Sequence, residues 1–107
     1  MSKLVEPDVQ HVIRPAADLV GAATEAFRVE LSNQLDSGAK QFTVDLCNVQ
    51  KIDAIGLGML VAVANKLSES GGRVMISNAS PAITRMLRVM RLDRILVIDD
   101  QGGSSNG

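Results

Sequence analysis

Two hydrophobic periods alternate along this chain, and together they predict strands that alternate with helices. Short, apolar runs with a period of two predict strands, and apolar residues spaced by three or four predict the helices between them. The predicted strands cover residues 9–13, 42–46, 73–77 and 95–98.

The first helix is predicted over residues 22–37. Within it, Phe27, Leu31 and Leu35 recur every four residues and form one apolar stripe between polar residues. Gly38 follows the last of them, where a glycine in the left-handed region is a common helix end.

Two further helices are predicted from their first residues. The side chain of Asp53 can cap a helix that extends to residue 70, and Ser80 followed by Pro81 is a strong helix start. The apolar positions shared by all these elements predict a common core of Phe27, Leu31, Val44, Leu46, Leu57, Leu60, Val61, Ile76 and Leu87.

The alternation of strands and helices indicates an α/β fold: a single domain whose central, four- to five-stranded, largely parallel sheet has helices packed on it. The domain is expected to cover residues 1–98, with residues 99–107 as a flexible tail, because residues 101–107 contain no apolar side chain. In such sheets functional residues gather at the carboxyl ends of the strands. The turn between residues 48 and 58 lies at such an end.

Composition excludes several classes of function. The net charge of −1 gives no reason to expect a nucleic-acid partner, and no apolar run reaches membrane-spanning length. The single cysteine, Cys47, cannot form an internal disulfide, which favours a cytoplasmic setting, and we expect it to pack as a small hydrophobe. The single histidine, His11, does not provide enough ligands for a metal site, and the sequence contains no convincing catalytic pair of nucleophile and base. The sequence therefore predicts no metal, no cofactor and no enzyme activity.

The turn before the second helix carries Asp53, Gly56 and Gly58. Asp53 is interpreted as a helix cap that can also belong to a docking turn for a partner. Glycine destabilises a helix, so two of them there need a reason: either close packing on the sheet, or close approach of a partner's backbone or a phosphate. A further run of four arginines recurs every third residue from Arg85 to Arg94 and is interpreted as a solvated helix face, with an acidic partner as the alternative.

Four segments, residues 12–20, 44–58, 71–80 and 90–96, resemble the STAS family (sulfate transporter and anti-sigma factor antagonist domains) in order and spacing. The first resembles the family's strand and Gly-Asp-like turn, although Ala17 replaces the glycine. In the second, Asp53 and Gly56 match the hallmark Asp-Ser-Ser-Gly. Ala54 and Ile55 stand where the family has hydroxyl residues, and Ile55 occupies the phosphoacceptor position.

The resemblance implies a non-catalytic, cytoplasmic domain that binds a serine-kinase-type anti-sigma factor or a histidine-kinase-like ATPase domain. The missing hydroxyls imply that phosphorylation at the usual position cannot switch it. The implied partner-binding residues are Asp53, Ala54, Ile55, Gly56, Gly58 and Met59. Ile55 and Met59 lie four apart, which predicts one exposed apolar spot, unless Ile55 packs into the fold.

Other functions remain open from the sequence. The main alternative is a STAS-type accessory subunit of a membrane transport ATPase for lipids. A two-component receiver with Asp45 as phosphoacceptor is less favoured, because the first strand lacks the acidic pair that such a site needs. The sequence leaves a homo-oligomer open.

Overall fold

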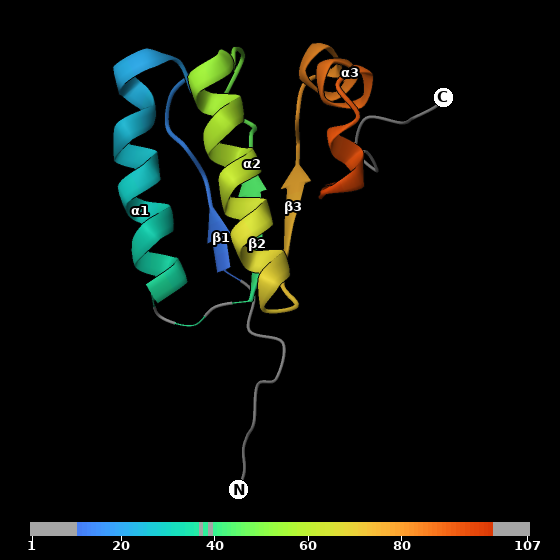
Figure 1. The fold of residues 1–107 in the computed structure, drawn as a ribbon. Helices are drawn as coiled ribbons and strands as arrows, with labels where there is room; N and C mark the ends of the chain where they lie inside the picture. The colour runs from blue at the N-terminus through green and yellow to red at the C-terminus, as the bar shows by residue number, and fades with distance from the viewer. Residues whose placement is uncertain (1–10, 37, 39, 100–107) are drawn as a thin grey trace, which may run out of the picture.

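The computed structural model describes residues 11–36, 38 and 40–99, and its elements follow the predicted alternation of strands and helices. Two short 3₁₀ helices, η1 and η2, precede α1 and β4. Figure 1 shows how the longer helices and the strands are arranged. The elements are, in chain order, β1 (His11–Ile13), η1 (Gly21–Ala23), α1 (Thr24–Asp36), β2 (Gln41–Asp45), α2 (Ala54–Glu69), β3 (Arg73–Ser77), α3 (Pro81–Val89), η2 (Leu92–Arg94) and β4 (Leu96–Asp99).

The described strands form one four-stranded parallel sheet in the order β1-β2-β3-β4. Each strand pairs with the next in sequence, so every connection crosses over through a helical segment, as parallel pairing requires. The carboxyl ends of the strands therefore meet at one end of the sheet, where the turns that lead into α1, α2 and α3 also lie. The predicted fold class is confirmed, with four strands.

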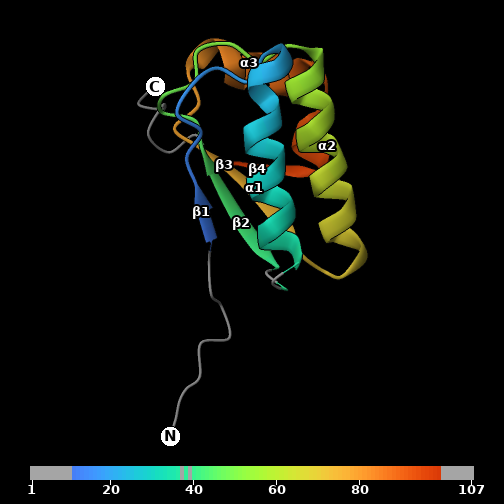
Figure 2. The same cartoon turned by 90° about the vertical axis from the view of Figure 1, so that its left-hand side faces the viewer.

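One face of the sheet carries the core. Phe42 and Val44 of β2 and Ile76 of β3 are buried, whereas the alternate residues Thr43 and Met75 are only half-buried. α1 and α2 lie side by side over the buried face, and α3 lies on the other side of α2 from α1 (Figures 1 and 2).

The predicted core is confirmed for all its residues except Val61. The other eight belong to one buried cluster, whereas Val61 is half-exposed and Val63 is buried in its place. The buried face of α2 is centred on Leu60 and Leu67 and is wider than the sequence interpretation assumed, because the helix contacts both the sheet and α1. Val61 lies outside that arc.

The predicted helix ends are also confirmed. Gly38 has a φ of +88°, and Asp53 and Ser80 cap α2 and α3 through their side chains. β4 begins at Leu96 and ends at Asp99, one residue beyond the predicted domain end. Residues 9 and 10 of the first predicted strand, and residues 100–107 of the predicted tail, lie outside the described residues.

Candidate functional site

The turn before α2 is organised around the carboxylate of Asp53. Its Oδ1 accepts a hydrogen bond from the backbone N–H of Gly56 at 3.0 Å, which caps α2, and its Oδ2 accepts one from the backbone N–H of Gly21 at 2.8 Å. These two backbone donors, Gly56 first, hold the pKa of Asp53 below its ordinary value. One carboxylate therefore fixes the starts of two helical segments, since Gly21 begins η1 just before α1.

The loops after β1 and β2 are joined by a short stretch of parallel pairing beside this carboxylate. Leu19 N–H donates to the carbonyl of Lys51, and Asp53 N–H donates to the carbonyl of Leu19, at 3.0 and 3.1 Å. The side chain of Asp18 accepts from the backbone N–H groups of Gln50 and Lys51 at 2.7 and 3.2 Å. The turn is thus held by backbone bonds to Leu19 and by the side chain of Asp18, and this network makes it a rigid part of the fold.

Gly56 is required by close packing. A Cβ at this position would lie 2.4 Å from the backbone oxygen of Leu19 and 2.9 Å from the side chain of Ile52. No side chain fits there, so this glycine serves close packing, although the contact is with the loops after β1 and β2 and not with the strands of the sheet. Gly58 differs: it is exposed, and a Cβ added to it would meet nothing within 4 Å.

The exposed face of α2 from Ala54 to Ala62 is small, apolar and uncharged. It is formed by Ala54, Ile55, Gly58 and Ala62, and we call these four residues the α2 face. Ile55 is its largest side chain and is 59% exposed, so it projects from the fold rather than packing into it. α2 has no charged residue before Lys66.

The prediction that Met59 joins Ile55 in an exposed spot is wrong. Met59 is only 8% exposed and belongs to the core cluster. A step of four residues turns the side chain by about 40° around the helix, and here that rotation crosses the boundary of the buried arc. The sequence interpretation assumed a narrower buried face and therefore treated Met59 as exposed.

A shallow cavity of about 340 Å³ opens beside Asp53, between the turn and the first turns of α3. Ile52 and Ile83 contribute apolar walls, and Lys51 and Gln50 lie at its polar side. No sequence pattern indicated it, because its two sides are about thirty residues apart in the chain.

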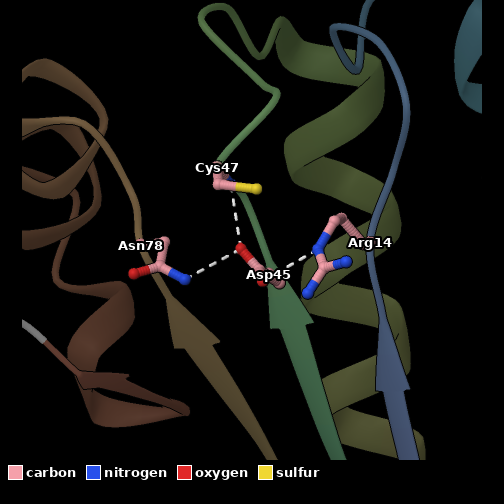
Figure 3. Close-up of polar contacts among 4 residues, drawn as sticks. All are labelled: Arg14, Asp45, Cys47 and Asn78. Carbon is pink, nitrogen blue, oxygen red and sulfur yellow. Dashed lines mark hydrogen bonds and ion pairs between the residues drawn. The ribbon is translucent and has the colours of Figure 1, made fainter.

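A second carboxylate, Asp45 at the end of β2, is buried in a polar cluster (Figure 3). Its Oδ1 accepts from Asn78 Nδ2 and from the backbone N–H of Cys47, and its Oδ2 accepts from Arg14 Nε, each at 3.0 Å. Burial alone would raise the pKa of Asp45, but the bonds from Asn78, Cys47 and Arg14 outweigh it and lower that pKa from 3.8 to about 2. With every donor supplied by the protein, Asp45 is a structural carboxylate and a poor candidate for a phosphoacceptor.

Cys47 does not pack as a small hydrophobe, as the sequence suggested, but is exposed. Its backbone N–H donates to Asp45 in this cluster. The four arginines from Arg85 to Arg94 are solvent-exposed, as interpreted from the sequence, but they do not form one helix face. Only Arg85 and Arg88 lie on α3, because the helix ends at Val89 and Arg91 has a φ of +61°.

The described part of the chain contains no group of three or more His, Cys, Asp or Glu side chains arranged to hold a metal ion. Within residues 11–36, 38 and 40–99, no helix combines the length and apolar character needed to cross a membrane.

Comparison with known proteins places this chain in a family. Residues 2–98 match the family described as "Mlab, STAS domain". A protein of Thermotoga maritima, named as a candidate anti-sigma factor antagonist, is 32% identical over 66 residues, which are 62% of this chain and 58% of that protein. A homologue from Thermotoga neapolitana is 30% identical over the same shares of the two chains. The match thus spans less than two thirds of the length of these relatives.

Solved structures of two similar proteins have the same fold as this chain. The crystal structure of the Thermotoga maritima candidate antagonist TM1081 superposes with a TM-score of 0.78 at 25% identity, covering 88% of this chain and 80% of that one. The unphosphorylated anti-sigma factor antagonist SpoIIAA superposes with a TM-score of 0.65 at 22% identity, covering 80% of this chain and 78% of that one, which is a likeness of fold. The chain belongs to the STAS domain family and is similar to anti-sigma factor antagonists.

Proposed function

We propose that this STAS domain is a cytoplasmic, non-catalytic antagonist that binds a serine-kinase-type anti-sigma factor or a related histidine-kinase-like ATPase domain. Docking uses the Asp53 turn and the α2 face. The similarity to candidate anti-sigma factor antagonists supports the class of partner. The observation that carries the proposal is the exposure of Ile55 on an uncharged helix face that starts at a rigid turn.

Rigidity and exposure together suit this surface to protein binding. The two bonds of Asp53 hold the first turn of α2 in place, so a partner would not have to order it on binding. Ile55 stands out as a single large apolar side chain among small ones. Apolar anchors at the centre of an interface often supply most of its binding energy. Met59 is not part of the docking surface in this proposal, because it is buried.

The proposed antagonist is not switched by phosphorylation at the turn. Ala54 and Ile55 carry no hydroxyl group, so the family's usual phosphoacceptor position cannot receive a phosphate. A phosphate would bring a charge of about −1.5 to −2 onto a face that is uncharged here. The chain therefore stays competent to bind its partner whatever the activity of the kinase.

The proposal is tested with an Ile55→Asp variant, which places a charge where a phosphate would otherwise lie. We expect affinity for the anti-sigma partner, measured by titration calorimetry, to fall by about tenfold or more, or about 1.4 kcal/mol. The matched control is Val29→Asp, which makes the same kind of change at a 46% exposed position on α1. A folded Ile55→Asp protein that binds as tightly as the parent would contradict docking at the α2 face.

A second experiment addresses the missing switch. Incubation with a family serine kinase and ATP is expected to leave residues 53–58 unmodified, and the double change Ala54→Ser with Ile55→Ser is expected to restore phosphorylation there. Phosphate found by mass spectrometry on the parent at Ser68, Ser70 or Ser77, together with loss of binding, would show that the switch has moved to another residue.

The alternative, an accessory subunit of a lipid-transport ATPase, predicts a different companion at the same surface. Affinity purification with the parent and with Ile55→Asp as baits separates the two functions. An anti-sigma kinase retained by the parent and lost by the variant supports the antagonist. A transport ATPase with that behaviour supports the accessory subunit.

A further inference from the structure

The two outer helices of the fold carry opposite charge. α1 has three acidic residues, Glu25, Glu30 and Asp36, and one arginine, Arg28, which is paired with Glu25. The segment from α3 to Ile95 has four arginines and one acid, Asp93, although the chain as a whole has a net charge of −1. We call these two surfaces the acidic edge (residues 24–36) and the basic edge (residues 81–95).

Each edge also exposes at least one large apolar side chain among its charges. Six large hydrophobic residues are exposed in the described part of the chain, and three of them lie on the basic edge: Val89 at 74%, Met90 at 51% and Ile95 at 37%. A fourth, Val29, lies on the acidic edge and is 46% exposed. On α1, Glu25 and Val29 are four residues apart and share a face, as Arg85 and Val89 do on α3.

The two edges lie on opposite sides of α2. The sheet order is β1-β2-β3-β4, and α2 lies between α1 and α3 (Figures 1 and 2). One molecule therefore cannot bring its own edges together, whereas the acidic edge of one copy can meet the basic edge of the next. The α2 face lies between the two edges and stays outside such a contact.

We propose that this chain associates head to tail with copies of itself, the basic edge of one molecule docking on the acidic edge of another. The contact pairs arginines with carboxylates around the apolar side chains at the centre of each edge. It joins two different surfaces, so each added molecule leaves one edge free and growth does not stop at a dimer. A contact between single helical edges belongs to the small class of interfaces, below about 1,200 Å², so the association is weak and needs high concentration.

Sedimentation equilibrium of the purified chain tests this assembly. At about 0.01 M ionic strength, where charges act over about 30 Å, we expect the average mass to rise steadily with concentration beyond that of a dimer. At about 0.15 M the range falls to about 8 Å, and association is expected to weaken several-fold. A monomer throughout, or a mass that levels off at the dimer, overturns the proposal.

Charge reversal identifies the surfaces. Arg85→Glu with Arg94→Glu makes both edges acidic, and Glu30→Lys with Asp36→Lys makes both basic. Each double variant alone is expected to be monomeric, and an equimolar mixture of the two is expected to associate again, because every edge then meets one of opposite sign.

Attraction between any two proteins of opposite net charge is the simplest competing explanation for that mixture. The control is Lys40→Glu with Lys66→Glu, which changes the net charge by the same amount as the arginine variant but alters residues outside both edges. We expect the control to associate with itself like the parent. A control that is monomeric alone, like the arginine variant, overturns the edge assignment.

Two other partners for the basic edge are outcomes of the same test. If the parent is monomeric but sediments with vesicles containing anionic lipid, and Arg85→Glu with Arg94→Glu abolishes this, the basic edge binds a membrane surface and self-association is wrong. If an acidic protein partner binds the parent but the chain remains a monomer, self-association is equally wrong. The Ile55→Asp variant is expected to associate like the parent, which separates this proposal from the one for the α2 face.

Discussion

Asp45 ends β2 and Asp53 lies eight residues further along the chain, and the fold uses these two carboxylates in different ways. Asp53 accepts only from backbone N–H groups, those of Gly56 and Gly21, so it defines the path of the chain at the start of two helical segments. Asp45 accepts from two side chains, Arg14 and Asn78, as well as one backbone group, so it ties β2 to the residues that follow its two neighbouring strands.

The difference separates a docking turn from a structural cluster. At Asp53, backbone N–H groups bond to both carboxylate oxygens, and the next two side chains, Ala54 and Ile55, are exposed to solvent. At Asp45, the donors surround the carboxylate and leave it only 6% exposed. A rigid turn that presents an apolar side chain can be recognised, whereas a buried and saturated carboxylate can only stabilise the fold.

The largest effect is expected from breaking the Asp53 turn with Gly56→Ala. The new Cβ would lie 2.4 Å from the carbonyl oxygen of Leu19, a backbone atom that cannot swing aside. α2 must shift away from the loop after β1, and overpacking of this kind costs about 2 to 3 kcal/mol. Urea denaturation measures the loss, and partner affinity should fall with it. A variant as stable as the parent would show that the turn is less rigid than its bonds indicate.

Breaking the Asp45 cluster with Asp45→Asn is expected to have the next largest effect, and one that depends on pH. The pKa of Asp45 is lowered from 3.8 to about 2, so its stabilising effect is present above pH 3.8 and is lost as the pH falls towards 2. At about 1.4 kcal/mol per pKa unit, the charged form contributes about 2 kcal/mol at neutral pH.

Urea midpoints measured from neutral pH down to about pH 2 test this assignment. The parent and Asp45→Asn should differ most at neutral pH and converge at the acid end. The control is Asp36→Asn, at an exposed carboxylate on the end of α1, which removes a negative charge and leaves the Asp45 cluster intact. If the difference in urea midpoint between the parent and Asp45→Asn stays constant with pH, the cluster does not stabilise the fold through the charge of Asp45.

Two substitutions at Asn78 separate the effect of its backbone conformation on stability from the effect of its hydrogen bond to Asp45. This residue has a φ of +57° and donates to Asp45, so Asn78→Ala loses the bond and also strains the backbone, whereas Asn78→Gly loses only the bond. We expect the alanine variant to be less stable than the glycine variant by about 1 kcal/mol in urea denaturation. Equal stabilities would indicate that the left-handed conformation at residue 78 relaxes in the variants.

The contrast also explains which parts of the site could be predicted from sequence. Asp53 as a helix cap, and the alternation of strands and helices, depend on neighbours in the chain, and both are confirmed. The bond from Asp53 to Gly21 and the cluster of Arg14, Asp45 and Asn78 join residues more than thirty positions apart, and no local pattern encodes them.

Errors at the α2 face have a different cause. Helical spacing gives the order of side chains around α2, but not the width of the buried arc, which depends on how many neighbours the helix has. Contact with both the sheet and α1 buried Met59 and Val63 and left Val61 half-exposed. The two glycines illustrate the same limit, since only the position of the Leu19 carbonyl distinguishes the required Gly56 from Gly58.

Gly58 provides the smallest expected effect and a sharp test of the docking turn. It lies within α2, is exposed, and has room for a Cβ, so Gly58→Ala should stabilise the fold by about 0.5 to 1 kcal/mol through the helix propensity of alanine. Ala62→Gly, one turn further along the same face, is the matched control and should destabilise by a similar amount.

If the fold has no use for this glycine, the remaining reason is close approach of a partner to the α2 face. Gly58→Ala should then raise the urea midpoint and lower the affinity for the anti-sigma partner, while Ala62→Gly lowers the midpoint. A Gly58→Ala protein that is both more stable and equally tight in binding would remove Gly58 from the docking surface and leave Ile55 as its anchor.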